Sequence, residues 1–276
     1  MFEWRRVSKF KLTPLEWLLV AAGGILLLKT LGPKLRSYAV TDARTFNAVG
    51  DIDYGDDGRT SQNLISDNPT RIVLLGDFGY DRSPSVWWDS STMAPIRSSG
   101  IPIIPIIGNH DNSSQYLKIF GLTSWNYTRT LGNVRFVVLP ARPSLSSIES
   151  KVKAGQNDPN IRWVIPLMHK CIVTPKGSHH PPEISINFHK MFMKYSKVKL
   201  VLQAHNHNYF RSVKNGITYM VVGTGGRTPY NDASDLWTKV HLTNVYGVLK
   251  CSTTSTNINC RFVDNSGATR DSFSVS

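Results

Sequence analysis

The chain is poor in acidic residues, in cysteine and in long apolar runs. Asp and Glu together number 19 against 32 Lys and Arg, which gives a formal net charge of +13. That excess favours anionic partners such as phosphoesters, acidic lipid surfaces or nucleic acid, but it does not indicate a fold. The sequence contains no low-complexity tract, no solenoid-like repeat and no RNP-like, helix-turn-helix or zinc-finger pattern, so nucleic acid is not the favoured partner.

No apolar run reaches the roughly 17 to 25 residues that a membrane-spanning helix needs. The N-terminal run WLLVAAGGILLL, residues 17–28, lies between basic segments, and no small-x-small cleavage site follows it closely. We expect residues 1–40 to be one uncleaved signal anchor with a linker, which attaches an extracytoplasmic domain, residues 41–276, to a membrane. Cleavage followed by secretion, or an amphipathic helix, is the alternative.

The three cysteines agree with that placement. Cys251 and Cys260 flank the polar segment STTSTNIN and can close a small loop in an oxidising compartment, although the sequence leaves their pairing open. Cys171 is left over and is typical of a small buried residue.

From Thr45 onward, short apolar runs rich in Val and Ile alternate with segments of helical character. The runs are residues 46–49, 72–75, 101–107, 163–168, 198–202 and 219–222. Runs of this length and composition predict buried strands of a layered α/β domain.

Five of these runs lead directly into side chains that can bind metal. The side chains are Asp51, Asp77 with Tyr80, Asn109 beside His110, His169, and His205 with His207. Taken singly, Gly-Asp is typical of a turn, and a histidine at a strand end is typically a hydrogen-bonded structural residue. Because ligands bind outside the carboxyl ends of strands in α/β sheets, we expect the five groups to converge. The set exceeds the three or four protein ligands of one catalytic zinc and suits two metals that share a ligand.

The order of these motifs resembles that of the calcineurin-like metallophosphoesterase superfamily. The motifs are, in chain order, Gly-Asp, Gly-Asp-x-x-Tyr, Gly-Asn-His-Asp, His and His-x-His. Tyr80 and the glycine turn at 222–226 are similar to its purple acid phosphatase branch, and the resemblance covers residues 45–230. It implies a β-sandwich core flanked by helices, with metal ligands at the carboxyl ends of the strands. It also implies a dinuclear phosphoester hydrolase, an acid phosphatase-like phosphomonoesterase that uses a metal-bound hydroxide on a phosphorylated small molecule. The alternatives are a phosphodiesterase or nucleotidase of the same fold, or a non-catalytic surface binding protein that retains it.

The resemblance also implies a role for each matching residue. One metal is assigned to Asp51, Asp77, Tyr80 and His207, and the other to Asp77, Asn109, His169 and His205, with Asp77 as the bridge. The catalytic residues are His110, as proton donor or charge stabiliser, and the outer histidines His179 and His180. A phenolate from Tyr80 favours iron at the first site, with zinc, manganese or iron at the second. The oligomeric state is not indicated.

Two positions depart from the family pattern. Ala204 stands where the family usually has glycine before His-x-His, and Asp53 extends the first motif. Asp53 can be a further ligand, an acceptor behind the ligands or a loop residue. Trp87-Trp88, Trp125 and Arg227 are further candidates for the rim of the site, although Trp in such places more often packs in a core.

Overall fold

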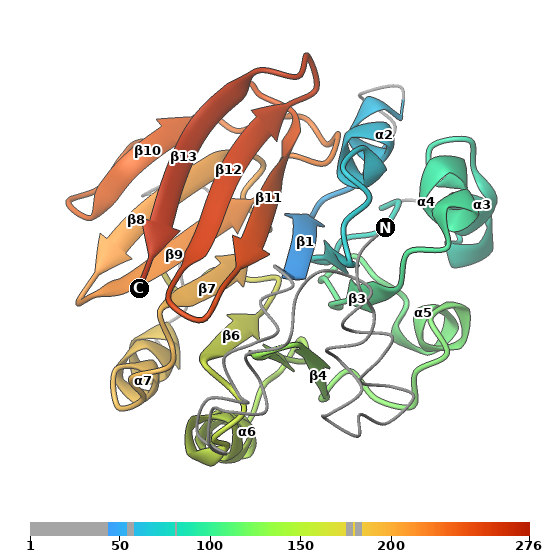
Figure 1. The fold of residues 1–276 in the computed structure, drawn as a ribbon. Helices are drawn as coiled ribbons and strands as arrows, with labels where there is room; N and C mark the ends of the chain where they lie inside the picture. The colour runs from blue at the N-terminus through green and yellow to red at the C-terminus, as the bar shows by residue number, and fades with distance from the viewer. Residues whose placement is uncertain (1–43, 54–57, 81, 175–178, 180–183) are drawn as a thin grey trace, which may run out of the picture. The chain divides into compact units, whose positions relative to one another are not determined.

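The computed structural model describes residues 44–53, 58–80, 82–174, 179 and 184–276, which belong to one compact unit, Ala43–Ser276 (Figure 1). The expected anchor, residues 1–40, and the catalytic candidate His180 lie outside the described residues. Within the described part of the chain, no helix has the length and apolar character needed to cross a bilayer.

The unit contains two β-sheets. The six-stranded sheet consists of β1 (Arg44–Val49), β2 (Arg71–Leu74), β3 (Ile103–Pro105), β11 (Gly247–Thr253), β12 (Ile258–Asp264) and β13 (Thr269–Val275). The seven-stranded sheet consists of β4 (Thr128–Leu131), β5 (Val134–Val138), β6 (Trp163–Leu167), β7 (Leu200–Gln203), β8 (Tyr209–Lys214), β9 (Ile217–Val222) and β10 (Thr238–Leu242). The helices are α2 (Arg59–Ile65), α3 (Pro84–Asp89), α4 (Ala94–Ser99), α5 (Ser113–Ile119), α6 (Leu145–Asn157) and α7 (Ile184–Phe192).

Parallel strands occupy the middle of the seven-stranded sheet and one side of the six-stranded sheet. The strand orders are β13-β12-β11-β1-β2-β3 and β10-β8-β9-β7-β6-β5-β4. β1, β2 and β3 are parallel, as are β5, β6, β7 and β9. Each of the six apolar runs of the sequence overlaps one of these parallel strands, although β3 is shorter than the run at 101–107. The carboxyl ends of these strands are therefore available to form one site.

The two sheets pack face to face, and helices cover their outer faces. Phe46 of β1 meets Phe136 of β5 edge to face at 5.2 Å between ring centroids, within the largest apolar cluster. Outside the seven-stranded sheet, buried residues of α6 and α7 pack on its strands. Outside the six-stranded sheet, buried residues of α2 to α5 do the same. The arrangement confirms the expected layered α/β fold with a sandwich core flanked by helices.

The C-terminal strands β11, β12 and β13 form an antiparallel meander that pairs with β1, as Figure 1 shows in red and orange. Cys251 and Cys260 face each other across β11 and β12 and form a disulfide. Cys171 is a free, buried cysteine whose thiol donates a hydrogen bond to the carbonyl oxygen of Ala204, at 2.8 Å. The pairing that the sequence left open is thus a cross-strand disulfide in the core between the sheets.

Candidate metal centre

The residues that follow the strands adopt an unusual backbone conformation. Asp51, Asp77, Tyr80 and His205 have φ values of 58°, 55°, 46° and 73°. They are four of the seven non-glycine residues with positive φ in the described chain, although this region is unfavourable for residues with a side chain. Strain of this kind persists where the surrounding structure enforces it, and it clusters at functional sites. The turns at the strand ends are therefore shaped for the side chains they present.

Hydrogen bonds join the strand ends of one sheet to those of the other. The backbone nitrogen of Gly50 donates to the carbonyl oxygen of Val222 at 2.9 Å. The backbone nitrogen of His205 donates to Oδ2 of Asp51, also at 2.9 Å. These bonds hold the end of β1 against the ends of β7 and β9, so the polar side chains of both sheets share one edge.

Two glycines permit close approach at this edge. A Cβ atom on Gly108 would lie 2.0 Å from Oδ1 of Asp77, so only glycine leaves room for that carboxylate. A Cβ atom on Gly50 would lie 2.4 Å from the Cβ of Ala204. Ala204 thus fits in place of the family's usual glycine because residue 50 is a glycine.

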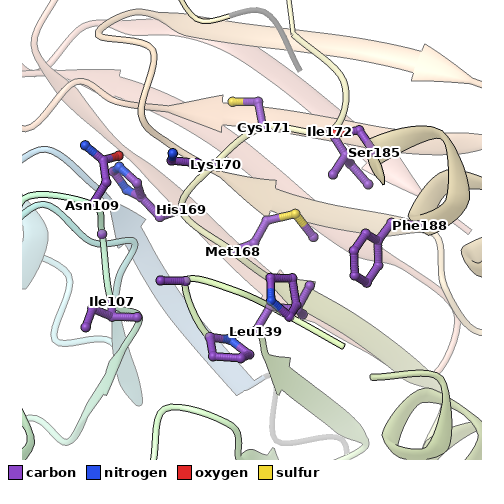
Figure 2. A pocket seen from close by; sticks show the side chains of 14 residues that line it. Ile107, Asn109, Leu139, Met168, His169, Lys170, Cys171, Ile172, Ser185 and Phe188 are labelled. Atoms are coloured by element: carbon purple, nitrogen blue, oxygen red, sulfur yellow. The ribbon is translucent and has the colours of Figure 1, made fainter. Parts of the chain in front are cut away.

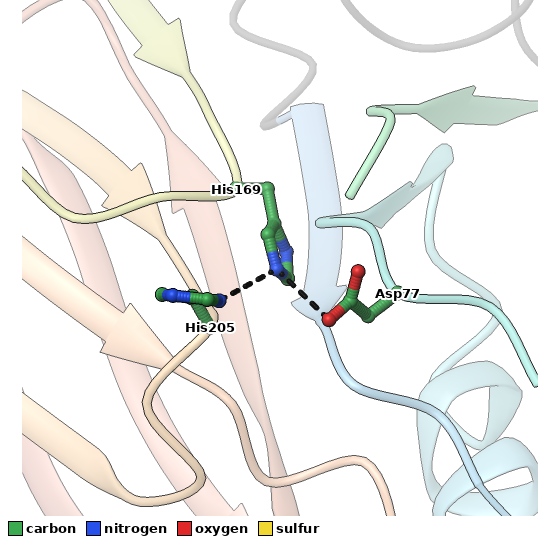
Figure 3. Close-up of side chains that lie close together, drawn as sticks. All are labelled: Asp77, His169 and His205. Atoms are coloured by element: carbon green, nitrogen blue, oxygen red, sulfur yellow. Dashed lines mark hydrogen bonds and ion pairs between the residues drawn. The ribbon is translucent and has the colours of Figure 1, made fainter. Parts of the chain in front are cut away.

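Asp77, His169 and His205 form one donor cluster, with a ligand atom from each within 4.8 Å of the others (Figure 3). Nε2 of His169 lies 3.2 Å from Oδ2 of Asp77 and 3.2 Å from Nδ1 of His205. Nδ1 of His169 donates to the carbonyl oxygen of Leu75 at 2.8 Å, which directs Nε2 toward the cluster. Oδ1 of Asp77 accepts a hydrogen bond from the backbone nitrogen of His110, so Oδ2 is the oxygen that faces His169.

The charges in this cluster favour a cation at its centre. Burial acts against the charged form of Asp77, but the hydrogen bond and charge of His169 outweigh it and lower the pKa of Asp77 to about 2. Burial likewise acts against protonated His169, but Asp77 raises its pKa to about 9. Burial and the charge of His169 lower the pKa of His205 to about 3. These pKa values favour an ionised Asp77 and a protonated His169 beside a neutral His205. A metal ion can supply the positive charge in place of the proton on His169.

Asp51, Tyr80 and His207 form a second donor cluster. The hydroxyl of Tyr80 donates to Oδ1 of Asp51 at 2.9 Å and lies 3.0 Å from Nε2 of His207. Nε2 of His207 lies 3.5 Å from Oδ1 of Asp51. Nδ1 of His207 donates to the carbonyl oxygen of Thr228 at 2.9 Å, so Nε2 is again the nitrogen left for the cluster. Carboxylate, phenol and imidazole thus meet in a buried place.

Arg227 and Tyr230 flank this second cluster. The guanidinium of Arg227 lies 4.2 Å from the centre of the Tyr80 ring, and its Nη1 donates to Oδ2 of Asp53 at 2.8 Å. Tyr230 stacks on His207 at 4.1 Å between ring centroids. Burial and then the charge of Asp51 raise the pKa of Tyr80, while Arg227 acts in the opposite direction. Asp53 therefore pairs with Arg227 beside this cluster.

The remaining predicted residues lie around the two clusters. Asn109 and His110 are exposed, and the ring of His110 lies 4.9 Å from that of Tyr80. Asn109 lines the same cavity as His169 (Figure 2). The ring of His179 meets that of His205 at 4.2 Å, and burial followed by the charge of His207 lowers the pKa of His179. The structure thus brings these side chains to the same edge as the clusters.

Tyr230, which stacks on His207, carries no local signal in the sequence. Asp53 and Asp111 belong to motifs of the sequence, but their contacts with Arg227 and with the backbone of Asp77 join positions distant in the chain. Trp87 and Trp125, which were candidates for the rim, are instead buried in the apolar cluster under α2 to α5. Arg227 is the rim candidate that reaches a donor cluster.

The donor chemistry fits two metal ions. The Asp51, Tyr80 and His207 cluster combines a carboxylate, a phenol and an imidazole, and the Asp77, His169 and His205 cluster combines a carboxylate with two imidazoles. Both sets suit first-row transition metals, and hydrogen bonds to backbone carbonyls fix the ring orientation of a histidine in each. Fold and site together define a metallophosphoesterase-like arrangement: a two-sheet sandwich with metal-ligand side chains at the parallel strand ends.

A family model described as calcineurin-like phosphoesterase matches residues 44–209, more than half of the chain. The chain therefore belongs to the calcineurin-like phosphoesterase family and is by class a phosphoester hydrolase. Among curated protein sequences, no match is found.

Three solved structures share the fold at low identity. GAP50, described as the anchor in the inner membrane complex of Plasmodium, is 12% identical, with a TM-score of 0.70 over 85% of this chain and 89% of that chain. A dimetal phosphatase from Danio rerio is 10% identical, with a TM-score of 0.60 over 84% and 98%. PhoD is 12% identical, with a TM-score of 0.59 over 84% and 69%.

Proposed function

We propose that this chain is a dinuclear metal-dependent phosphatase that hydrolyses phosphomonoesters, on the purple acid phosphatase branch of its family. The observation that carries the proposal is the pair of donor clusters at one edge, Asp51 with Tyr80 and His207 beside Asp77 with His169 and His205. A single metal needs only one such set, so two sets favour two metals.

Each cluster would hold one metal. The proposed ligands are Asp51, Asp77, Tyr80 and His207 for the first ion and Asp77, Asn109, His169 and His205 for the second. Asp77 is the ligand proposed to be shared, and its Oδ2 faces His169 while its Oδ1 accepts a hydrogen bond from the backbone nitrogen of His110. The tyrosine favours iron in the first place, with zinc, manganese or iron in the second. When bound, such a pair acidifies water and neutralises charge on phosphoryl oxygens.

His110 and His179 lie beside the donor clusters, where a phosphoryl group would bind. His110 is exposed and lies beside the Tyr80 ring of the Asp51, Tyr80 and His207 cluster, where it would give a proton to the departing alcohol oxygen. His179 lies against His205 and would orient the phosphoryl oxygens. The same role is proposed for His180 from the family resemblance.

We also propose that residues 1–40 attach the enzyme to a membrane, with the catalytic unit on the extracytoplasmic side. The apolar run at 17–28 and its basic flanks support this, and the Cys251–Cys260 disulfide suits an oxidising compartment. Secretion after cleavage of the segment is the alternative.

A non-catalytic anchor is the second candidate function. It is supported by the fold shared with GAP50, whose description is that of an anchor in a membrane complex. The assembly of two donor clusters favours the phosphatase instead, because a purely structural anchor has no need of converging metal ligands.

The test combines metal content with hydrolysis. Full-length chain in detergent would be analysed for metals and assayed with 4-nitrophenyl phosphate and bis(4-nitrophenyl) phosphate, alongside Asp77→Asn. The matched control is Asp89→Asn, which removes an exposed carboxylate at the end of α3. We expect about two metals per chain, a preference for the monoester, and loss of activity in Asp77→Asn alone. A folded chain that binds no metal and hydrolyses neither ester would favour the anchor.

A further inference from the structure

A cavity of about 70 Å³ lies beside the Asp77, His169 and His205 cluster (Figure 2). Asn109, His169 and Lys170 stand together at one side of it in this view, and Met168 and Phe188 at the other. The lining comes from the loops after β3, β5 and β6 and from α7. The cavity is thus continuous with the proposed second metal site through two of that site's ligands.

Apolar groups make up most of the lining away from that mouth. Leu139, Met168 and Phe188 are buried apolar residues, and Ile172 is half-buried beside them. Ser185 carries the one hydroxyl among the described lining side chains, and the Cys171 thiol already donates to Ala204. A ligand rich in hydroxyl groups would therefore lose its hydrogen bonds with water on entering the cavity and would find few protein groups to replace them.

We propose that this cavity binds the alcohol portion of the substrate and selects phosphomonoesters of small apolar alcohols. The inference rests on the proposed function, since a phosphoryl group bound at the second metal site, whose proposed ligands include Asn109 and His169, would place the ester substituent at the mouth of the cavity. Lys170, which is exposed at that mouth and forms no ion pair with a described residue, supplies positive charge for the phosphoryl oxygens. The size of the cavity limits the alcohol to a few carbon atoms, smaller than a nucleoside.

The experiment compares two non-hydrolysable phosphonates of equal charge. Binding of inorganic phosphate, methylphosphonate and butylphosphonate to the full-length, zinc-loaded chain would be measured by titration calorimetry. We expect butylphosphonate to bind on the order of tenfold more tightly than methylphosphonate, because its additional methylene groups leave water for the apolar lining.

Matched variants test the location of that preference. Ile172→Asn places a polar group in the cavity wall, whereas Ile186→Asn makes the same change at a residue of α7 that is 57% exposed. We expect the first variant to abolish the preference for butylphosphonate and the second to retain it. Ile172→Trp, which fills the cavity with an apolar group, should weaken butylphosphonate binding and leave methylphosphonate binding unchanged. Thermal unfolding would verify that each variant is folded.

The outcomes separate the two levels of inference. Equal binding of both phosphonates, with inorganic phosphate also bound, would overturn the pocket and leave the proposed phosphatase intact. If both Ile172 variants still bind butylphosphonate more tightly than methylphosphonate, the preference arises elsewhere on the protein, and the proposed role of this cavity is likewise wrong. Absence of binding by phosphate and by both phosphonates would overturn the proposed function, and this inference with it.

Discussion

The carboxylate of Asp111 supports the turn that holds Asp77: Oδ2 of Asp111 accepts a hydrogen bond of 3.0 Å from the backbone nitrogen of Asp77. The same carboxylate accepts hydrogen bonds of 2.6 Å from the backbone nitrogens of Gly108 and Phe78. The loop after β3 thereby fixes the strained turn after β2, in which Asp77 has a φ of 55°. Burial, followed by the charge of Asp77, raises the pKa of Asp111 to about 7.

Replacing Asp111 with Asn should therefore destabilise the metal-free chain. An amide nitrogen cannot accept the hydrogen bonds that a carboxylate oxygen accepts here, so at least one buried backbone N–H loses its partner. We expect a loss of roughly 1–3 kcal/mol in the free energy of unfolding, measured with urea at about pH 4, where the raised pKa keeps Asp111 uncharged in the folded chain and the substitution removes no charge. Asp89→Asn, at an exposed position, is the control. Equal stability of wild type and Asp111→Asn would show that the bonds to Asp111 do not support the turn.

The Cys251–Cys260 disulfide should contribute measurably to stability. It closes a short loop, with a sequence separation of 9. For a loop of this size, reduction should lower the free energy of unfolding by about 2–3 kcal/mol through the greater freedom of the unfolded chain. Thermal unfolding with and without a reductant would measure it, and the double variant Cys251→Ser, Cys260→Ser should show no response to reductant. Cys171→Ala should respond as wild type does, because Cys171 is not in the disulfide.

The sequence predicts the central strands well and the outer strands poorly. β1, β2, β6, β7 and β9 overlap the apolar runs because helices and the second sheet cover both of their faces, whereas the buried parallel strand β5 was not predicted. β12 and β13 instead mix buried with exposed positions, and their pairing depends on hairpin register and on β11, which pairs with the distant β1. Patterns of apolar residues specify burial, whereas these strands form where burial is only partial.

A similar distinction applies to the site. The proposed ligands can be read from the sequence because each directly follows an apolar run, and strand ends in α/β sheets are where ligands bind. The residues that hold these ligands in place cannot be read from the sequence in this way. Arg227 reaches Asp53 across 174 positions, and Asp111 reaches Asp77 across 34, with no local pattern to indicate either contact. Such contacts exist only after the sheets have packed.

The pH dependence of stability should include a contribution from Asp67. Burial acts against its charged form, but the hydrogen bonds from Lys250 and Ser66 outweigh it, so the pKa of Asp67 lies below its ordinary value of 3.8. Because the folded pKa is depressed, the stabilisation is present above about pH 4 and is lost as the pH falls through the folded value. Urea unfolding between about pH 2 and pH 6 should show a difference between wild type and Asp67→Asn that grows with pH and then levels off. Lys250→Met should reduce the same dependence, and a difference that is constant with pH would contradict it.

Membrane attachment should depend on the N-terminal segment. Full-length chain expressed in a cell with a secretory pathway should stay in the membrane pellet after alkaline carbonate washing, because an apolar segment within the bilayer resists removal by salt and high pH. A chain that begins at residue 41 behind a cleavable leader should appear in the soluble fraction. Extraction of the full-length chain by carbonate would contradict an anchor and favour surface association through its basic charge.

The identity of the first metal can be tested through Tyr80. Its hydroxyl lies within 3.0 Å of Oδ1 of Asp51 and of Nε2 of His207, so a cation among these three atoms would bind the phenol oxygen directly. Ferric iron favours a hard anionic phenolate, and such a pair absorbs visible light by charge transfer from ligand to metal. We expect the iron-loaded chain to be coloured and Tyr80→Phe to lose the absorption, with activity lowered on the order of tenfold or more because a ligand is lost. Tyr230→Phe is the matched control, since it retains the ring that stacks on His207. Colour that persists in Tyr80→Phe would assign the absorption to another group, whereas an active, colourless wild type would retain the dinuclear phosphatase and remove it from the tyrosine-ligated branch.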